Sequence, residues 1–205
     1  KGYPTGLANR SGLVGRFFMS HPSIDVMGRA GEKVYPYRIG FSTAMSRQFA
    51  IERERATRGA FLLEFLNSAG PTPEQIAIAS GLSGEALRRH VRAQFGHWLG
   101  IRVYCEQLPA RANAVSLAPN VRDYFGSPAP HIHCGLGRYE QKALDEAKDV
   151  ASRILAAMGL SQIRSSGLSY AGHQMGTHRM GTDPATSVVD VNQRCHDVPN
   201  LYLLG

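Results

Sequence analysis

Residues 172–190 read GHQMGTHRMGTDPATSVVD, a run in which two histidines stand five positions apart among three glycines and two methionines. Glycine tolerates backbone conformations and close approaches that other residues do not, so this density favours a loop over a helix or a strand. A loop of this kind can bring a histidine against a flat ligand. The alternative interpretation is a polar surface loop.

The chain around this run has the composition of a globular protein. Of its 205 residues, 43% are hydrophobic and 19% are charged, which is enough to bury one sizeable core or two small ones. The net charge of +7 would favour acidic partners if it gathered on one face, but Glu52 and Glu54 interrupt the first arginine cluster. Three cysteines without a C-x-x-C pair argue against a disulfide framework or a zinc ribbon. No apolar run approaches the roughly 18 residues of a membrane span.

Periodicity predicts a mixed sheet with helices packed on it, an α+β fold. Strand-like alternation occurs at residues 24–41, 101–108, 114–117 and 131–134, and the second and third of these are predicted to form a hairpin across a turn-forming P-A-R-A-N stretch. Helical patterns occur at residues 57–66, 74–79, 84–95 and 139–158, the last ending at Gly159.

The two ends of the chain suggest a piece of a longer protein. Residues 1–22 are rich in glycine and small side chains and read as a loop that crosses a surface. Residues 198–205 form a short apolar run typical of a buried strand, and the chain stops where that strand should turn into a loop.

Three blocks of sequence resemble the glucose-methanol-choline (GMC) oxidoreductases. The H-x-x-G-T-x-x-M-G pattern at 173–181, V-V-D at 188–190 and P-N-L-Y-L-L-G at 199–205 are similar to the C-terminal signature of that family. N-R-S-G-L-V-G-R at 9–16, followed by H-P at 21–22, resembles the segment that leaves its flavin domain. E-Q-L-P-x-x-x-N-x-V-S-L at 106–117 with D-Y-F-G-S-P at 123–128 resembles its substrate-domain hairpin. The sequence H-Q-M-G-T-H-R-M-G at 173–181 is most similar to that of bacterial sugar and polyol dehydrogenases and of pyranose oxidases.

This resemblance implies a domain organisation. Residues 1–22 would leave a Rossmann-like FAD domain, residues 23–170 would form the substrate-binding domain on an antiparallel sheet, and residues 171–205 would carry the catalytic loop and the strand that returns to the FAD domain. The G-x-G-x-x-G fingerprint of such a domain is not in this sequence. The family's second catalytic position, a His or Asn, would fall beyond Gly205.

The resemblance also implies a reaction. We expect an FAD-dependent oxidoreductase that acts on CH–OH groups of sugars, polyols or other alcohols, with His173 as the base that takes the hydroxyl proton while a hydride passes to the flavin. Gly205 would deliver bare backbone to the phosphate and ribityl region of the cofactor, and the sequence alone does not separate this role from that of a turn glycine. His178 is expected to pack or hydrogen-bond locally.

A metal site is not predicted. His131 and His133 would lie on one face of a strand, but no third ligand stands at a sensible spacing. The expected partners are an alcohol or sugar substrate and an electron acceptor, which could be oxygen, a quinone or a cytochrome. The resemblance to bacterial sugar dehydrogenases implies a bacterial protein of the periplasm or the cytoplasm, and the sequence does not decide between the two.

One interpretation from another class of protein is open. Residues 74–92 have the alanine-then-glycine spacing of a helix-turn-helix, with arginines on the second helix. This pattern would make the chain a DNA-binding protein. We favour the oxidoreductase because the flanks of this segment resemble its substrate domain, and we therefore expect no nucleic-acid partner. The isolated chain, which lacks the phosphate-binding half, is expected to be inactive.

Overall fold

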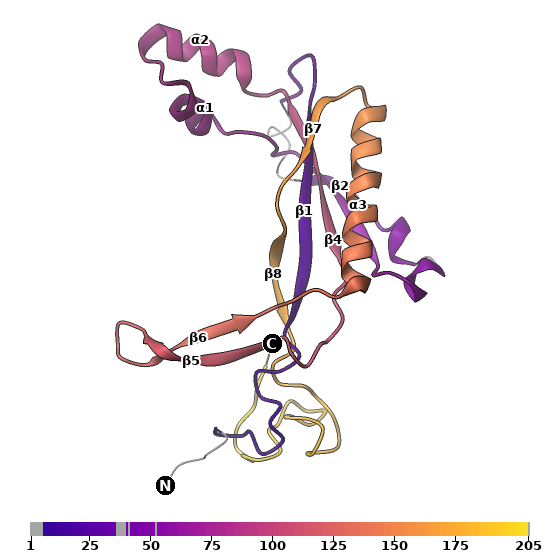
Figure 1. Cartoon of the computed structure of the whole chain (residues 1–205), viewed down its shortest axis with the longest axis vertical. Helices are drawn as coiled ribbons and strands as arrows, with labels where there is room; N and C mark the ends of the chain where they lie inside the picture. The colour runs from indigo at the N-terminus through magenta and orange to yellow at the C-terminus, as the bar shows by residue number, and fades with distance from the viewer. Residues whose placement is uncertain (1–5, 36–39, 41, 52, 205) are drawn as a thin grey trace. The chain divides into compact units, whose positions relative to one another are not determined.

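The computed structural model describes residues 6–35, 40, 42–51 and 53–204, and it divides the chain into two compact units (Figure 1). The first, which we call the histidine unit, comprises Lys1–His21, Gln107–Gly137 and Gly172–Gly205. The second, the sheet unit, comprises Pro22–Glu106 and Arg138–Ala171. Each unit is therefore assembled from segments that are far apart in the sequence.

An antiparallel sheet is the centre of the sheet unit. Its strands run in the order β2-β3-β4-β1-β7, and β8 pairs with β1 off this path. The bounds are β1 (Met19–Arg29), β2 (Ser42–Ser46), β3 (Phe61–Leu66), β4 (Trp98–Cys105), β7 (Ser161–Ser165) and β8 (Ser169–Met175). The first residues of β1, up to His21, and the last of β8, from Gly172, belong to the histidine unit. Val26, Ile101 and Val103 are completely buried in its middle strands, which places the core on the face that alternate residues share.

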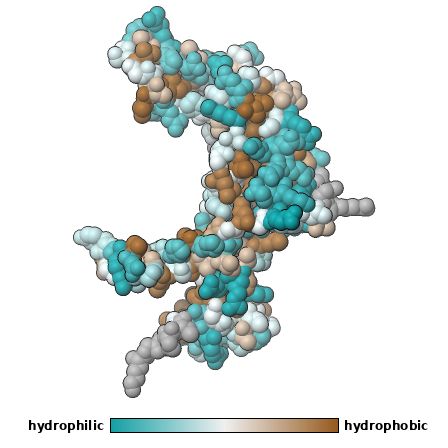
Figure 2. Space-filling view, viewed as in Figure 1, coloured by the Kyte–Doolittle hydropathy of each residue, from teal (hydrophilic) through white to brown (hydrophobic). Residues whose placement is uncertain are grey.

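Helix α3 (Arg138–Ala157) covers that face and packs against β3, β4 and β7. Its buried stripe recurs at three and four positions and contains Ala143, Leu144, Ala147, Val150, Ala151 and Leu155. Three alanines in this stripe let the helix approach the sheet closely, and Gly159 at φ 77° ends the helical segment. The outer side of α3 is predominantly hydrophilic (Figure 2). The prediction of a helix at 139–158 is confirmed.

Two short helices follow β3. A capping box between Thr72 and Gln75 starts α1 (Pro73–Ser80), and Gly81 ends it in the left-handed conformation at φ 63°. Helix α2 (Gly84–Gln94) follows and contacts α1. Both helices predicted at 74–79 and 84–95 are confirmed. Because α1 buries only Ile76 and α2 buries no residue, neither is a core element.

The predicted helix at 57–66 is wrong. A 3-10 turn, η2 (Arg53–Ala56), comes just before that stretch, a second 3-10 turn, η1 (Gln48–Ala50), precedes it, and residues 61–66 form strand β3. Strand β3 pairs with β2 on one side and β4 on the other. A strand between two neighbours carries a near-continuous apolar run, which periodicity alone does not distinguish from a buried helix.

The predicted hairpin between 101–108 and 114–117 is also wrong, although both strands exist. Strand β4 pairs with β1 and β3, whereas β5 (Ala114–Arg122) pairs with β6 (Pro128–His133) in a separate two-stranded ribbon. The third predicted strand at 131–134 is therefore the partner of β5. Turn-forming residues between two strands permit a hairpin but do not choose the partner, which non-local contacts decide.

The described residues after β8 form turns and isolated bridges. Tyr202 bridges Arg194, and Leu204 is 81% exposed, so the buried strand predicted at 198–205 is not found over 198–204. The backbone there bonds locally, with Leu203 N donating to Gln193 O at 3.0 Å. The described parts of the two chain ends contain no Rossmann-type strand–helix unit. The architecture is thus mixed α/β with antiparallel sheets and three α-helices.

None of the described helices combines the length and the apolar character that crossing a membrane requires.

Candidate active site

His173 lies near the end of β8, and its side chain is exposed. The prediction of a loop throughout 172–190 therefore needs correction, because residues 172–175 belong to a strand and only the residues after Met175 turn away from it. A strand next to a paired neighbour holds its backbone more firmly than a loop does. An exposed imidazole on such a backbone is accessible to a small molecule.

The ring of His21, on strand β1, contacts the ring of His173, and both residues belong to the histidine unit. The two ring centroids are 5.4 Å apart and the rings meet edge to face at 83°. His21 is half-buried. His21 and His173 are 152 positions apart in the sequence, and the sequence alone indicated no partner for His21. The pairing of β8 with β1 brings the two residues together (Figure 1).

Gly176 explains why the chain after His173 turns where it does. Its φ is 89°, and a Cβ on it would overlap the carbonyl group of Phe17. On either side of this approach, Thr177 N donates to Arg16 O at 3.0 Å, and Gly15 N donates to Thr177 O at 2.7 Å. The close approach that the glycines permit is therefore made, at Gly176, to the chain's own backbone and not to a ligand.

A hollow of about 390 Å³ lies beside this turn. It is lined by Phe18, by Gln193 and by the run from Gln174 to Met180. The amide oxygen Oε1 of Gln193 is buried and has no hydrogen-bond partner among the residues that the structure describes. Since a buried acceptor without a donor is costly, this oxygen suits a group that brings an N–H or O–H to it.

These features fit one side of a cofactor site. A Cβ on Gly172 would meet nothing within 4 Å, and because neighbouring residues of a strand point to opposite faces, this open space lies on the face of β8 opposite to the His173 side chain. The 390 Å³ hollow is at the lower end of the range of about 300–1,000 Å³ for ligand pockets, so it could not enclose a dinucleotide. The described residues of the histidine unit can thus present a base and part of a wall, and the remaining walls must come from elsewhere.

His178 occupies the same turn but has local contacts. Its Nδ1 lies 3.5 Å from Thr177 Oγ1, and the neighbouring Arg179 guanidinium stands 5.1 Å from the ring centroid of Phe17. The ring of His178 is half-buried. This agrees with the expected local role.

Two buried amides, Gln107 and Asn113, hold the segment that carries His21. Gln107 Oε1 accepts a hydrogen bond from Ser20 N at 2.9 Å, and Gln107 Nε2 donates to Gly135 O at 3.2 Å. Asn113 exchanges two hydrogen bonds with Gly135 at 2.8 and 3.0 Å. Sequence reasoning missed both roles, although both residues stand in the block at 106–117, where their polar character between apolar neighbours was a usable signal.

His196 closes the loop after Gly181. Its Nε2 lies 2.9 Å from Ser187 Oγ and 3.1 Å from Gly181 O, while Ser187 Oγ donates to Asp183 O. Because the hydroxyl hydrogen of Ser187 is donated to a backbone carbonyl, the hydrogen between the two side chains comes from His196 Nε2. His196 therefore does not accept a proton from Ser187, as the base of a nucleophilic serine would. Ser187 is buried next to the small core of Leu13, Val188 and Val189, so the cluster stabilises the loop.

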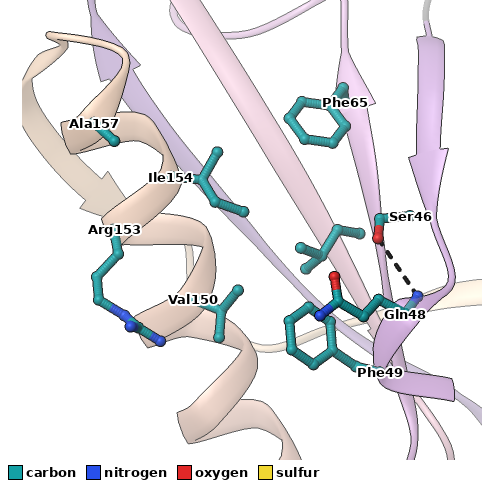
Figure 3. Close-up of a pocket in the computed structure, with 9 residues that line it drawn as sticks. Ser46, Gln48, Phe49, Phe65, Val150, Arg153, Ile154 and Ala157 are labelled. Atoms are coloured by element: carbon teal, nitrogen blue, oxygen red, sulfur yellow. Dashed lines mark hydrogen bonds between the residues drawn. The ribbon is translucent and has the colours of Figure 1, made fainter. Parts of the chain in front are cut away.

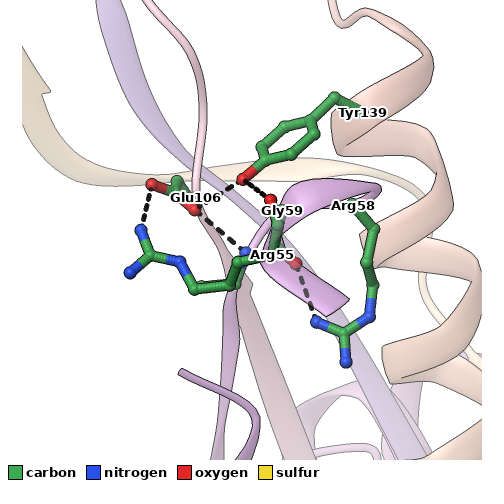
Figure 4. A network of polar contacts seen from close by, with 6 residues as sticks. Arg55, Arg58, Gly59, Glu106 and Tyr139 are labelled. Atoms are coloured by element: carbon green, nitrogen blue, oxygen red, sulfur yellow. Dashed lines mark hydrogen bonds and ion pairs between the residues drawn. The ribbon is translucent and has the colours of Figure 1, made fainter. Parts of the chain in front are cut away.

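A separate polar network lies in the sheet unit, where Glu106 follows β4 (Figure 4). Its carboxylate accepts hydrogen bonds from Arg55 at 2.8 Å and Ala60 N at 3.0 Å, and Tyr139 Oη lies 3.2 Å away. Burial works against ionisation of Glu106, but the bonds from Ala60 and Arg55 outweigh it and hold the pKa of this carboxyl below its ordinary value. The network ties the end of β4 to the start of α3.

The sheet unit also contains a hollow of about 430 Å³ between α3 and strands β2 and β3 (Figure 3). Its lining is mostly apolar, with Phe49, Phe65 and Ile154 facing the space. Arg153, the charged residue of the lining, pairs with Asp149 at 2.9 Å. Nothing in this lining can exchange a proton near neutral pH, so it does not compete with His173 as a catalytic site.

The remaining predicted positions lie as follows. His131 and His133 are exposed on β6, two positions apart and hence on one face. Within the part of the chain that the structure describes, no three His, Cys, Asp or Glu side chains gather as a metal site would need. Gly205, the expected cofactor contact, is outside the described residues.

Comparisons with known proteins agree with the resemblance. A family model described as GMC oxidoreductase matches residues 109–205, a range that includes His173 and the turn after it. The chain is 30% identical over 202 residues to the fructose dehydrogenase large subunit of Gluconobacter japonicus, covering 98% of this chain and 37% of that protein. It is 26% identical over 213 residues to 2-methyl-1,2-propanediol dehydrogenase of Mycolicibacterium austroafricanum, covering 100% and 39%. It is 30% identical over 204 residues to paromamine 6'-oxidase of Streptomyces fradiae, covering 98% and 36%.

The chain spans less than two fifths of the length of these relatives. Two of these relatives are named as dehydrogenases, of fructose and of a diol, and the third is named as an oxidase of paromamine. Neither the fold nor any of these matches supports the helix-turn-helix interpretation of residues 74–92.

Proposed function

We propose that this chain carries the catalytic base of an FAD-dependent enzyme that oxidises CH–OH groups of sugars or polyols, because a GMC oxidoreductase family model matches its residues 109–205 and its relatives act on such compounds. The substrate class follows from the relatives, three of which are named for a sugar, a diol and an aminoglycoside. The enzyme itself would be longer than this chain.

The observation that carries the proposal is the position of His173. Its imidazole is exposed on a strand and lies within the family match. A neutral imidazole nitrogen accepts the hydroxyl proton of the substrate. As that O–H bond breaks, a C=O bond forms and the C–H bond of the carbinol carbon breaks with both of its electrons.

FAD, when bound, supplies the acceptor for the departing hydride. The part of this chain is to hold the proton acceptor at a fixed place and to provide one wall of the site. The hollow lined by Phe18, Met175 and Met180 would form that wall. Gln193, whose buried Oε1 has no hydrogen-bond partner among the described residues, also lines this hollow. We further propose Gly205 as a backbone contact to the cofactor.

The proposed organisation assigns residues 1–22 and 171–205 to the side that meets the FAD domain, and residues 23–170 to substrate binding. Two of these three segments are the parts of the histidine unit that carry His21 and His173. The electron acceptor, whether oxygen, a quinone or a cytochrome, would be engaged by the complete enzyme.

The test uses the complete flavoprotein that contains this segment. Under anaerobic conditions, its oxidised flavin absorbance is followed in a stopped-flow instrument after mixing with sugars and polyols. We expect bleaching with at least one of these substrates, and a large loss of the bleaching rate in His173→Ala. Bleaching at the wild-type rate in His173→Ala would remove this histidine from the role of base.

A further inference from the structure

The rings of His173 and His21 contact each other within the histidine unit, and they come from strands β8 and β1, which pair with each other. The centroids are 5.4 Å apart at an interplanar angle of 83°. Edge-to-face contact is one of the preferred arrangements of aromatic rings, since the positive edge of one meets the negative face of the other. The arrangement restrains rotation of an exposed side chain that would otherwise sample several rotamers.

The His21 side of the pair is rigid. The preceding residue, Ser20, is 1% exposed and donates its backbone N–H to Gln107 Oε1 at 2.9 Å. The following residue, Pro22, has a fully buried side chain. Two residues before Ser20, Phe18 N donates to Asn113 O at 3.1 Å. Because the residues before and after His21 are held by hydrogen bonds or burial, the Cα atom from which the half-buried His21 ring projects is fixed in place.

The His173 side is tied to the same segment. Gly176 packs against the carbonyl of Phe17, and Thr177 N donates to Arg16 O at 3.0 Å. The stretches 15–21 and 173–177 thus run together, and their contacts determine how far apart the two imidazoles stand. The His173 ring is exposed to substrate, and its contact with the firmly held His21 ring limits its orientation. A general base needs both accessibility and a defined orientation.

We propose that His21 is a positioning residue: its ring holds the imidazole of His173 in the orientation that directs a nitrogen at the substrate hydroxyl. This inference rests on the proposed function, because it assumes that His173 is the base. His21 contributes as a ring and not as a second proton acceptor. A flat aromatic side chain at position 21 should therefore serve, and a flexible polar side chain should not.

The experiment compares four variants of the complete flavoprotein: His21→Phe, His21→Gln, His173→Ala and, as a control in the sheet unit, His90→Ala. The limiting rate of flavin reduction and the substrate dissociation constant are obtained separately from the substrate dependence of anaerobic bleaching. We expect His21→Gln to lower the limiting rate by about 10-fold, corresponding to about 1.4 kcal/mol in the barrier, and to leave substrate dissociation nearly unchanged. His21→Phe should stay within about 3-fold of the wild type, since it keeps the edge-to-face contact. His90→Ala should match the wild type.

A readout other than activity accompanies the rates. In crystals of His21→Gln, the His173 ring should rotate away from its wild-type orientation or occupy more than one, whereas in His21→Phe it should keep one. Flavin content and thermal unfolding of each variant show whether the protein is intact. If His21→Gln fails to fold, His21→Phe decides between the roles, since a loss as large as that of His173→Ala would mean that position 21 needs an imidazole.

The outcomes separate the two hypotheses. A slow His173→Ala with an unaltered His21→Gln overturns the positioning role and leaves the base in place. An unaltered His173→Ala overturns the proposed function itself. Equal losses in His21→Phe and His21→Gln contradict the ring restraint and point to proton chemistry at His21.

Discussion

The backbone of Gly176 lies directly against the carbonyl group of Phe17, so closely that any side chain on Gly176 would overlap it. Its φ of 89° is in the region that L-residues rarely adopt. The turn that follows His173 is therefore shaped by contact with a segment about 160 positions earlier. Substitutions in this turn test how strongly that contact holds the site.

Gly176→Ala should destabilise the protein by at least about 2 kcal/mol, because positive-φ strain of about 1–3 kcal/mol adds to the overlap with Phe17. Flavin reduction should fall in parallel as the β8 turn shifts. Urea denaturation measures the stability. The matched control is Gly172→Ala, where a Cβ meets nothing within 4 Å and the free energy of unfolding should change by less than about 1 kcal/mol.

His173→Ala in the complete enzyme should lower the rate of flavin reduction by about 100-fold or more, the usual contribution of a general base. Flavin should stay bound, because an exposed side chain contributes little to the fold. The stopped-flow rate and the flavin-to-protein absorbance ratio measure the two effects. His178→Ala serves as the comparison, and an equal loss there would contradict the choice between the two histidines.

The isolated 205-residue chain should neither retain FAD after gel filtration nor oxidise sugars with an artificial electron acceptor. Its sequence contains no G-x-G-x-x-G fingerprint, and its hollow of about 390 Å³ is too small for the whole cofactor. The complete parent should be yellow and active under the same conditions. Turnover by the chain alone would show that we have placed the flavin site wrongly.

Glu106→Gln should reduce stability at neutral pH and have little effect in acid. The folded pKa of Glu106 lies below the ordinary value of about 4.3, so its ionised form stabilises the fold above that pH, and the contribution is lost as pH falls through the folded pKa. Because Arg55 is partly exposed, the expected cost at pH 7 is about 0.5–1 kcal/mol. Thermal unfolding of both proteins between pH 7 and about pH 2 should show a constant difference down to about pH 4.3 and a shrinking difference below it. A difference that grows in acid would contradict the network.

Cys105 should resist alkylation in the native protein. Burial raises the pKa of its thiol to about 12, so at pH 8 only about one thiol in 10⁴ is ionised. Cys134 is half-buried and should react with iodoacetamide first. Mass spectrometry of peptides after a timed reaction distinguishes the two, and unfolding in urea should make them equal. Prompt native labelling of Cys105 would mean that β4 opens readily.

The sequence predicted local elements well where their signals are local. Helix α3 was recognisable from apolar spacing and its stop at Gly159, and α1 and α2 from the helical patterns at 74–79 and 84–95. It failed for β3, since an apolar strand between two neighbours has no period that separates it from a helix. It also failed for the partner of β4, which lies across the sheet and not across the nearest turn.

The sequence by itself predicted the resemblance to GMC oxidoreductases, with which the family match over 109–205 agrees, and proposed the candidate base, because the H-x-x-G-T-x-x-M-G pattern at 173–181 keeps its order and spacing in one continuous stretch. Only the tertiary structure decided which residues surround His173. Its neighbour His21 and the buried amide Gln107 that holds the backbone of Ser20 come from segments 152 and 66 positions away. Such contacts depend on the pairing of strands and the burial of polar groups, which are non-local free energies that no short stretch of sequence contains.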